Sequence, residues 1–224
     1  MNQRLIDVYD GFTLKHHEKF LTNDIEFDAM WGKPIKGVTL QIDLSEDVRD
    51  ALYNLQDELS KLEPEALLLT PRPFQHISFN QVVYWSGNYK LGHDQTWAAM
   101  KKDFLAKFQN LDNRFPSFPI SFIKLIPMTS AIIWAALDEH DKIQTLREAF
   151  KAKLPFPTET TKGNTFIHTT VARYKTKLRN PLRVLQFLEA YKASTSMMVN
   201  EIILRKESQY PTMQSTELAR IQLQ

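Results

Sequence analysis

The feature of this sequence that most constrains its fold is an internal repeat. Two five-residue segments, Phe74–Ser78 and Phe166–Thr170, each carry a phenylalanine, a histidine and a hydroxyl residue at alternate positions. A β-strand points alternate side chains to one face of its sheet, so each segment, when extended, presents a ring, an imidazole and a hydroxyl together. Of the six histidines in the chain, only His76 and His168 are followed two residues later by serine or threonine.

The residues before each motif repeat as well. Segment 37–44 has the alternating apolar residues of a strand, and Ser45 is then expected to cap a helix. Segment 131–137 is likewise predicted as a strand, with Asp138 as the cap of the following helix. The two helices have apolar residues at helical spacing, which are Leu52, Leu55, Leu59 and Leu62 in the first and Ile143, Leu146, Phe150 and Leu154 in the second.

The spacing between equivalent positions agrees between the two halves of the chain. The predicted strand ends are 137 − 44 = 93 residues apart, and the histidines are 168 − 76 = 92 residues apart. An offset shared to one residue predicts two similar lobes, each with a strand, a helix and a motif strand. We therefore expect an α+β fold of two pseudo-symmetric lobes of antiparallel sheet, flanked by helices, with a central cleft.

Two motif strands that face each other would bring two imidazoles and two hydroxyls into that cleft. Unperturbed imidazole titrates near pH 6.5, so one histidine can accept a proton while the other donates one. The hydroxyls can hold the non-bridging oxygens of a phosphoryl group. The alternative is a pair of half-buried strand histidines with ordinary hydrogen bonds, which the repeat around them makes less favoured.

The paired motifs resemble the signatures of the two-histidine (2H) phosphoesterase superfamily, which includes cyclic phosphodiesterases and RNA-processing relatives. The second motif, within 166–174, is the closer match, and the stretch 199–223 is similar to the family's closing hairpin. The first motif departs from the pattern at Ser78, where threonine is more usual. The resemblance covers residues 36–224 and implies a single bilobal domain there, with the lobe boundary near residues 110–119.

The resemblance also implies a reaction. It implies metal-independent opening of a cyclic phosphodiester, or transesterification of a phosphodiester, on a 2′,3′-cyclic nucleotide or an RNA end, with no cofactor. His76 and His168 would be the general base and the general acid, in an order that the sequence leaves open, and Ser78 and Thr170 would bind phosphate oxygens. Two alternatives stay open: a module that binds a nucleotide or RNA end without turnover, and a scaffold with no ligand cleft.

Four more residues are candidates for the lining of the cleft. Phe74 and Phe166 share strand parity with the histidines and are expected either to stack a base or to pack in the core. Tyr174 has the same parity and lines the cleft if its strand is regular, whereas Arg173 points away unless a β-bulge turns it inward. The alternating cations Arg173, Lys175, Lys177 and Arg179 are either a basic edge for a phosphate chain or, more commonly, a solvated strand edge.

Residues 1–35 lie outside the repeat. They contain more large apolar side chains than a disordered tail would, which are Phe12, Phe20, Ile25, Phe27, Met30 and Trp31. We expect this segment to pack on the body, and beside the cleft it would restrict which substrates enter. His16 and His17 are not predicted to bind metal, because adjacent residues diverge and no partner ligands are identifiable.

One further motif is incomplete. Gly87 and Gly92 have the spacing of a phosphate-binding P-loop, but His93 and Asp94 stand where that motif needs lysine and a hydroxyl residue. Asp94 is better interpreted as the cap of a helix.

Composition sets outer limits on function. With 224 residues and a 43% apolar content the chain can bury a sizeable core. The lack of cysteine excludes disulfides, thiolate catalysis and cysteine-bound zinc. A net charge of +2 is too small to predict strong non-specific nucleic-acid binding. No segment has the roughly eighteen consecutive apolar residues of a membrane span, and the N-terminus lacks a secretory pattern, so we expect a cytoplasmic protein with no membrane and no obligate protein partner.

Overall fold

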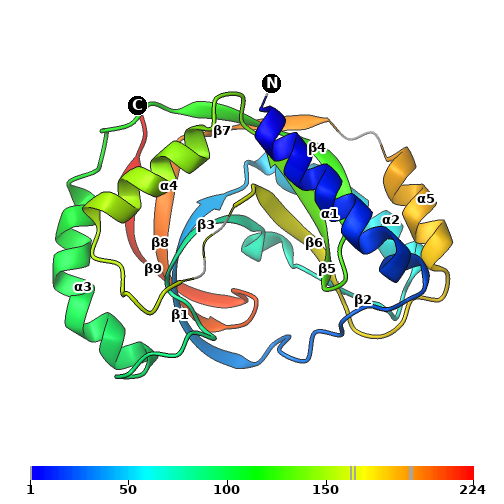
Figure 1. Cartoon of the computed structure of the whole chain (residues 1–224), viewed down its shortest axis with the longest axis horizontal. Coiled ribbons are helices and arrows are strands. Elements are labelled where there is room, and N and C mark those ends of the chain that lie inside the picture. The colour runs from blue at the N-terminus through cyan, green and yellow to red at the C-terminus, as the bar shows by residue number, and fades with distance from the viewer. Residues whose placement is uncertain (1, 162, 164, 192–193) are drawn as a thin grey trace.

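Two antiparallel β-sheets form the body of the protein, and Figure 1 shows them facing each other across its centre. The computed structural model describes residues 2–161, 163, 165–191 and 194–224. The first sheet, which we call lobe 1, contains β3 (His76–Val83), β1 (Pro34–Asp43), β8 (Glu201–Gln209) and β9 (Gln214–Gln222) in that spatial order. The second, lobe 2, contains β2 (Leu67–Leu69), β6 (His168–Tyr174), β5 (Ala131–Leu137), β4 (Phe118–Pro127) and β7 (Thr195–Val199).

Helices cover the outer faces of both sheets. They are α1 (Gln3–Leu21), α2 (Glu46–Leu62), α3 (His93–Gln109), α4 (Lys142–Lys153) and α5 (Pro181–Ala190), with a short 3-10 turn η1 (Arg72–Phe74) before β3. In Figure 1, α3 and α4 lie outside lobe 1, and α1, α2 and α5 lie outside lobe 2. The predicted α+β class with two sheet lobes is confirmed, and β8 and β9 form the predicted terminal hairpin. Within the described residues, no helix is both long enough and apolar enough to cross a membrane.

The repeat found in the sequence is also a repeat of strand register. In lobe 1, β1 pairs with β3 so that Asp43 lies opposite His76 and Gln41 opposite Ser78. In lobe 2, β5 pairs with β6 so that Ala135 lies opposite His168 and Ile133 opposite Thr170. Each of these positions is related to its counterpart by 92 residues, because 135 − 43, 133 − 41, 168 − 76 and 170 − 78 all equal 92.

A β-bulge recurs at the same place in both motif strands. In β3 the pairing skips Phe79, and in β6 it skips Val171, again 171 − 79 = 92 residues apart. One extra residue reverses the alternation of side chains beyond it. The residue five positions after the histidine, Gln81 in β3 and Arg173 in β6, therefore points to the same side as the histidine.

The helix of each repeat covers the sheet of the other. Helix α2, which follows β1, packs on β6 and β7, and α4, which follows β5, packs on β3. The rings of Phe150 in α4 and Phe79 in β3 are 5.2 Å apart in an edge-on arrangement. Since β1 and β3 are antiparallel, the connection leaves and re-enters at one end of the sheet, so its helix need not cross its own sheet. The two lobes are thereby interlocked.

The chain passes between the two sheets several times. Residues 110–119 connect α3 outside lobe 1 to β4 of lobe 2, but β2 has already joined lobe 2, and β8 and β9 return to lobe 1. The passage at 110–119 is therefore one of several.

The helix starts agree only in part with the caps expected from the sequence. Ser45 is the N-cap of α2, as predicted. The N-cap of α4 is Asp141, three residues after Asp138, although the Asp138 carboxylate still accepts the Ile143 amide at 2.6 Å. The expectation for Asp94 was wrong, since Gly92 is the N-cap of α3 at φ 74°. The Asp94 carboxylate instead forms ion pairs, with Lys36 at 2.7 Å and Lys206 at 3.0 Å.

Helix α1 lies against lobe 2. Its Tyr9 is buried, and the hydroxyl donates toward the carbonyls of Ala136 and Ile167 at 2.6 and 2.8 Å and accepts the Ile167 amide. Because Ile167 directly precedes His168, the helix fixes the start of the second motif strand.

Candidate active site

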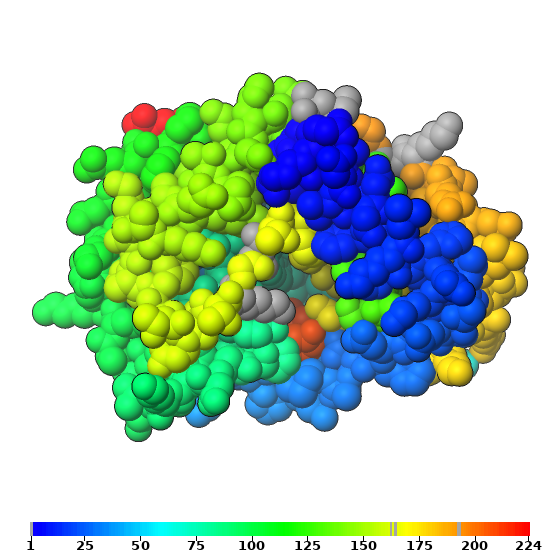
Figure 2. All heavy atoms as spheres, viewed as in Figure 1, coloured from blue at the N-terminus to red at the C-terminus, as the bar shows by residue number. Residues whose placement is uncertain are grey.

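A cavity of about 350 Å³ opens between the two sheets. Figure 2 shows the surface hollowed there, between the segment that leads into β1 (blue) and the loop that follows α4 (yellow). A cavity of this size is at the lower end of the range for small-molecule sites, which is roughly 300 to 1,000 Å³. Seven of the eight residues singled out from the sequence line it, namely Phe74, His76, Ser78, Phe166, His168, Thr170 and Arg173.

His76 is held by the turn that precedes it. Its Nδ1 lies 2.8 Å from the Phe74 carbonyl oxygen, which can only accept, so Nδ1 carries the proton. The neutral ring then has its lone pair on Nε2, which lies 3.4 Å from the Ser78 hydroxyl oxygen. Burial lowers the pKa of His76, while the bond to Phe74 and the charges of Glu207 and Asp43 oppose that shift. His76 is therefore neutral near pH 7, with a proton acceptor on Nε2.

His168 is placed by aromatic packing. Its ring stacks on Phe166, with centroids 4.5 Å apart and planes 25° apart. The Phe166 ring also meets Phe12 of α1 edge-on at 4.9 Å. Phe166 thus lines the cavity and packs between α1 and His168, and its stacking on a base stays a prediction. Phe74 lines the cavity from η1, outside the strand that the motif predicts.

The β-bulge in β6 determines which of Arg173 and Tyr174 lines the cavity. Arg173 reaches the cavity, whereas Tyr174, which a regular strand would have pointed into the cleft, is fully buried on the opposite side. The Tyr174 hydroxyl donates to the Met128 carbonyl at 2.9 Å, and burial raises the pKa of this tyrosine. Its ring lies 6.3 Å from that of Phe20, so Tyr174 belongs to the core between lobe 2 and α1.

The other cations after the second motif do not join the cavity. Lys175 and Lys177 are exposed, and Arg179 forms an ion pair with Glu65 at 2.9 Å. This part of the basic series is thus a solvated edge.

His16 is buried and accepts the Thr129 amide at 3.3 Å on Nδ1. Within the described residues no three candidate metal ligands gather in one place.

A buried carboxylate, Glu207, forms part of the lobe 1 wall. One oxygen accepts the amide of Gln41 and the hydroxyl of Thr212, each at 2.8 Å. The other approaches the backbone at Gly37 so closely that a Cβ there would lie 2.9 Å from it. Glycine at position 37 therefore allows the carboxylate to pack against β1 beside the cavity.

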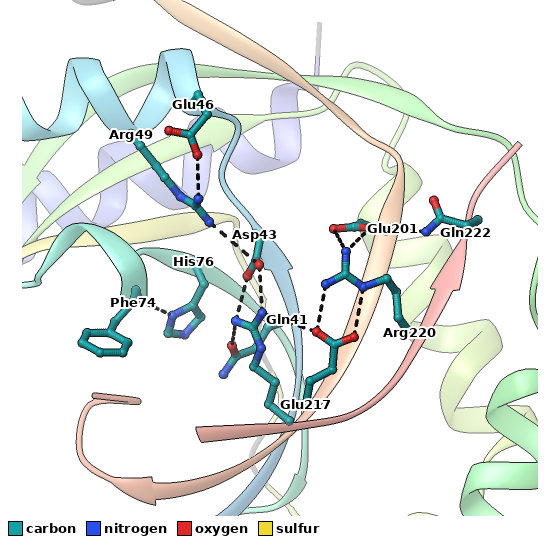
Figure 3. A network of polar contacts seen from close by, with 11 residues as sticks. Gln41, Asp43, Glu46, Arg49, Phe74, His76, Glu201, Glu217, Arg220 and Gln222 are labelled. Carbon is teal, nitrogen blue, oxygen red and sulfur yellow. Dashed lines mark hydrogen bonds and ion pairs between the residues drawn. The ribbon is translucent and has the colours of Figure 1, made fainter. Parts of the chain in front are cut away.

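An ion-pair network continues behind His76, as Figure 3 shows. Arg205 binds Asp43 through two nitrogens, each at 2.9 Å, and Arg49 lies 3.8 Å from the same carboxylate. The network extends to Glu217, Arg220 and Glu201 at the outer edge of lobe 1. Asp43 lies opposite His76 in the register of β1 and β3. The charges of Asp43 and Arg205 therefore act on the pKa of that histidine in opposite directions.

Sequence reasoning missed two buried polar residues that connect the lobes. From α4, Arg147 donates to the carbonyls of Phe79 at 2.8 Å and of Ser78 and Phe166 at 3.2 Å. From α2, Gln56 donates to the carbonyls of Val171 at 2.8 Å and Thr70 at 3.0 Å. Each residue thus satisfies the carbonyl of a bulge residue, Phe79 or Val171, in the motif strand of the lobe that its helix covers. Arg147 also spans both motifs.

A sequence signal for this pair does exist. Both residues lie four positions after an apolar residue of a buried helical stripe, at 52 + 4 = 56 and 143 + 4 = 147, and directly follow another, Leu55 or Leu146. Polar residues at such positions are buried and need partners. Burial lowers the pKa of Arg147 to about 10, so it remains charged near neutrality.

Comparison with known proteins gives likeness in structure only. No protein-family model matches the sequence, and no curated protein matches it significantly. Escherichia coli LigT in complex with 3′-AMP matches with a TM-score of 0.58 at 13% identity, over 85% of this chain and 99% of that chain. ATU0111, a conserved protein of unknown function from Agrobacterium tumefaciens, matches with a TM-score of 0.64 at 15% identity, over 90% of this chain and 97% of that chain.

The chain has the LigT fold. TT0787 of Thermus thermophilus also shares it, with a TM-score of 0.57 at 16% identity over 83% of this chain and 97% of that chain. The matches span nearly the whole length of these proteins. LigT has also been crystallised with phosphate and with ATP.

Proposed function

We propose that this protein is a 2H-type phosphoesterase that opens the cyclic phosphate of a 2′,3′-cyclic nucleotide or RNA end. The observation that carries the proposal is the repeat at the cavity: two histidines, two hydroxyls and two bulges, all related by 92 residues, meet between two sheets. The likeness in fold to LigT, which has been crystallised with 3′-AMP, supports a nucleotide as the ligand of this cavity.

In the proposed reaction His76 is the general base. Its Nε2 takes a proton from water as the water oxygen attacks phosphorus, because the neutral ring bears its lone pair there. The bond between phosphorus and one ribose oxygen breaks, and His168 gives that oxygen a proton. The products are a phosphomonoester and a free ribose hydroxyl, and the enzyme ends with protonated His76 and neutral His168.

The remaining polar residues of the cavity would bind the phosphate. The hydroxyls of Ser78 and Thr170 and the guanidinium of Arg173 are donors that can stabilise charge on the non-bridging oxygens. Gln81, the counterpart of Arg173 in lobe 1, contributes a neutral amide. These groups are a sufficient donor set without a divalent ion, so the proposal is metal-independent.

The experiment is a turnover assay on a panel of 2′,3′-cyclic nucleotides, run with and without EDTA. Wild type is expected to hydrolyse at least one of them at the same rate in both conditions. The matched control is His140→Ala, which removes an exposed imidazole away from the cavity and should leave the rate unchanged, whereas His168→Ala should abolish most of it. Saturable binding without turnover would favour a binding module, and dependence on an added metal would contradict the mechanism.

A further inference from the structure

The segment between α1 and β1 brings a carboxylate to the cavity's arginine. The Asp28 amide donates to the Tyr174 carbonyl at 2.8 Å, and Phe27 forms a bridge with the same residue. One oxygen of Asp28 accepts the Met30 amide at 2.9 Å, and the other lies 3.3 Å from Nε of Arg173. Only 7% of the Asp28 side chain is exposed, so backbone and side chain are both fixed.

Arg173 is held on two sides by groups outside its own strand. Asp28 lies at its Nε, and its guanidinium carbon lies 5.2 Å from the centre of the Tyr210 ring, which comes from the β8–β9 hairpin. Among the described residues no hydrogen bond engages its two terminal nitrogens. Arg173 can therefore offer that end to a ligand in the cavity, while its charge is already offset by Asp28.

The charges around the cavity are close to balanced. Arg173 is a fixed cation and His168 carries the proton that the proposed reaction uses, while Glu207 and Asp28 are carboxylates and His76 is neutral near pH 7. A cyclic phosphodiester carries one negative charge, whereas the phosphomonoester formed from it carries nearly two, since its second pKa is about 6. The same phosphorus site would thus meet one charge before the reaction and two after it.

We propose that Asp28 is a specificity-determining residue that makes this site select singly charged phosphodiesters over doubly charged phosphomonoesters. This inference rests on the proposed function and names the feature that sets its substrate class. By offsetting Arg173, Asp28 leaves enough attraction for a monoanion and reduces the extra attraction for a dianion. It therefore also favours release of the monoester product. Residues 22–33 thereby acquire a functional role besides packing.

The test compares, within each protein, the inhibition constant of 3′-AMP with the KM for 2′,3′-cyclic AMP. Competitive inhibition by 3′-AMP and KM for 2′,3′-cyclic AMP are measured for wild type, Asp28→Asn and Asp24→Asn. The last is the matched control, because Asp24 is an exposed acid of the same segment whose nearest cation, Lys19, is 3.9 Å away. Asp28→Asn should tighten 3′-AMP about tenfold, an order-of-magnitude expectation for one nearby charge, and change KM by less. Asp24→Asn should change neither.

A pH series separates charge from shape. At pH 5 most of the 3′-AMP monoester is singly charged, so the preference of Asp28→Asn for it should shrink toward that of wild type. Asp28→Ser, which keeps an acceptor for the Met30 amide, should behave like Asp28→Asn and replaces it if that variant does not fold. If the wild type is active but Asp28→Asn and Asp24→Asn have the same ratio of the 3′-AMP inhibition constant to KM, the role of Asp28 is wrong and the proposed function still stands. A wild type that neither turns over the cyclic nucleotide nor binds 3′-AMP overturns the proposed function with it.

Discussion

Lobe 1 and lobe 2 present a histidine and a hydroxyl on matching bulged strands, yet the groups around the two histidines differ in kind. His76 lies in front of the Asp43–Arg205 ion pair and near the carboxylate of Glu207. His168 lies on the Phe166 ring, which packs on α1. Five residues after each histidine, lobe 1 has the neutral Gln81 and lobe 2 has the cation Arg173.

This difference indicates how a repeated backbone can serve an asymmetric reaction. Acid/base catalysis needs one proton acceptor and one donor, which two identical surroundings would not favour. The matching strands supply the geometry, and the side chains from β8, α1 and residues 22–33 supply the difference. Each lobe's contribution can therefore be tested by changes that disturb one lobe and leave its counterpart intact.

The largest effect is expected from the histidines themselves. His76→Ala and His168→Ala should each lower kcat by roughly 10² to 10⁴, the usual contribution of a positioned acid or base. Because the two act in one step, the double variant should be little worse than either single variant. Steady-state kinetics on 2′,3′-cyclic AMP measures all three. Additive losses would show that the two histidines do not act as a unit, and normal turnover in one single variant would show that only one lobe takes part in proton transfer.

The next effect concerns the two residues that connect the lobes. Arg147→Met removes the side-chain donor of three carbonyls and should lower the free energy of unfolding by about 2 to 4 kcal/mol. Gln56→Met removes the side-chain donor of the Val171 carbonyl, while the Thr70 carbonyl still accepts from Gln75, and should cost about 1 to 2 kcal/mol. Urea unfolding checks both values, with Arg183→Ala on the exposed side of α5 as the control.

Arg147→Met should also lower kcat at temperatures where it is folded, because Arg147 bonds to both motif segments. Gln56→Met should affect kcat less. Equal stability and equal activity in the two variants would show that the bond each residue makes to its bulge carbonyl matters, and that the additional bond from Arg147 to Phe166 does not.

A smaller effect is expected on the pH profile. Since His76 is the base and its pKa is lowered, the acid limb of kcat/KM should lie below the ordinary imidazole value of about 6.5. The Glu207 carboxylate opposes that shift, so Glu207→Gln should move the acid limb to still lower pH while leaving the alkaline limb in place. Glutamine keeps an acceptor for Gln41 and Thr212. Movement of the alkaline limb instead would assign His76 as the acid.

Much of the architecture was predictable because it follows from patterns between residues that are close in the sequence or repeated at one offset. Strand alternation, helical spacing and the histidine offset gave the sheet type, the repeat and the two motifs. The bulges were not predictable, because Phe79 and Val171 are ordinary apolar strand residues and neither strand contains a glycine or proline that would mark a bulge. For that reason the sequence left Tyr174 and Arg173 as alternatives, Tyr174 for a regular strand and Arg173 for a bulged one, and the bulge in β6 places Arg173 at the cavity. The sequence of an amphipathic helix shows that one face is buried, but not which sheet buries it. The packing of α2 on lobe 2 and of α4 on lobe 1 was therefore not predicted.

The charges at the cavity were the least predictable part. Asp28 and Arg173 are 173 − 28 = 145 residues apart, and Glu207 reaches the wall from the last hairpin. No local spacing connects such residues. By contrast, Arg147 and Gln56 had a readable signal, a polar residue at an apolar helical position, which predicts burial although not the partner.

The smallest effect is expected from exchanging the two hydroxyl types. Ser78→Thr gives lobe 1 the residue of lobe 2, and Thr170→Ser does the reverse, while either hydroxyl can donate to a phosphate oxygen. Each should change kcat/KM by less than about threefold, since roughly 1.4 kcal/mol is needed for a factor of ten. Ser78→Ala and Thr170→Val remove the donors and should each cost about tenfold or more. If Ser78→Thr alone lowered kcat/KM as much as Ser78→Ala, the space beside Nε2 of His76, rather than the hydroxyl, would distinguish lobe 1 from lobe 2.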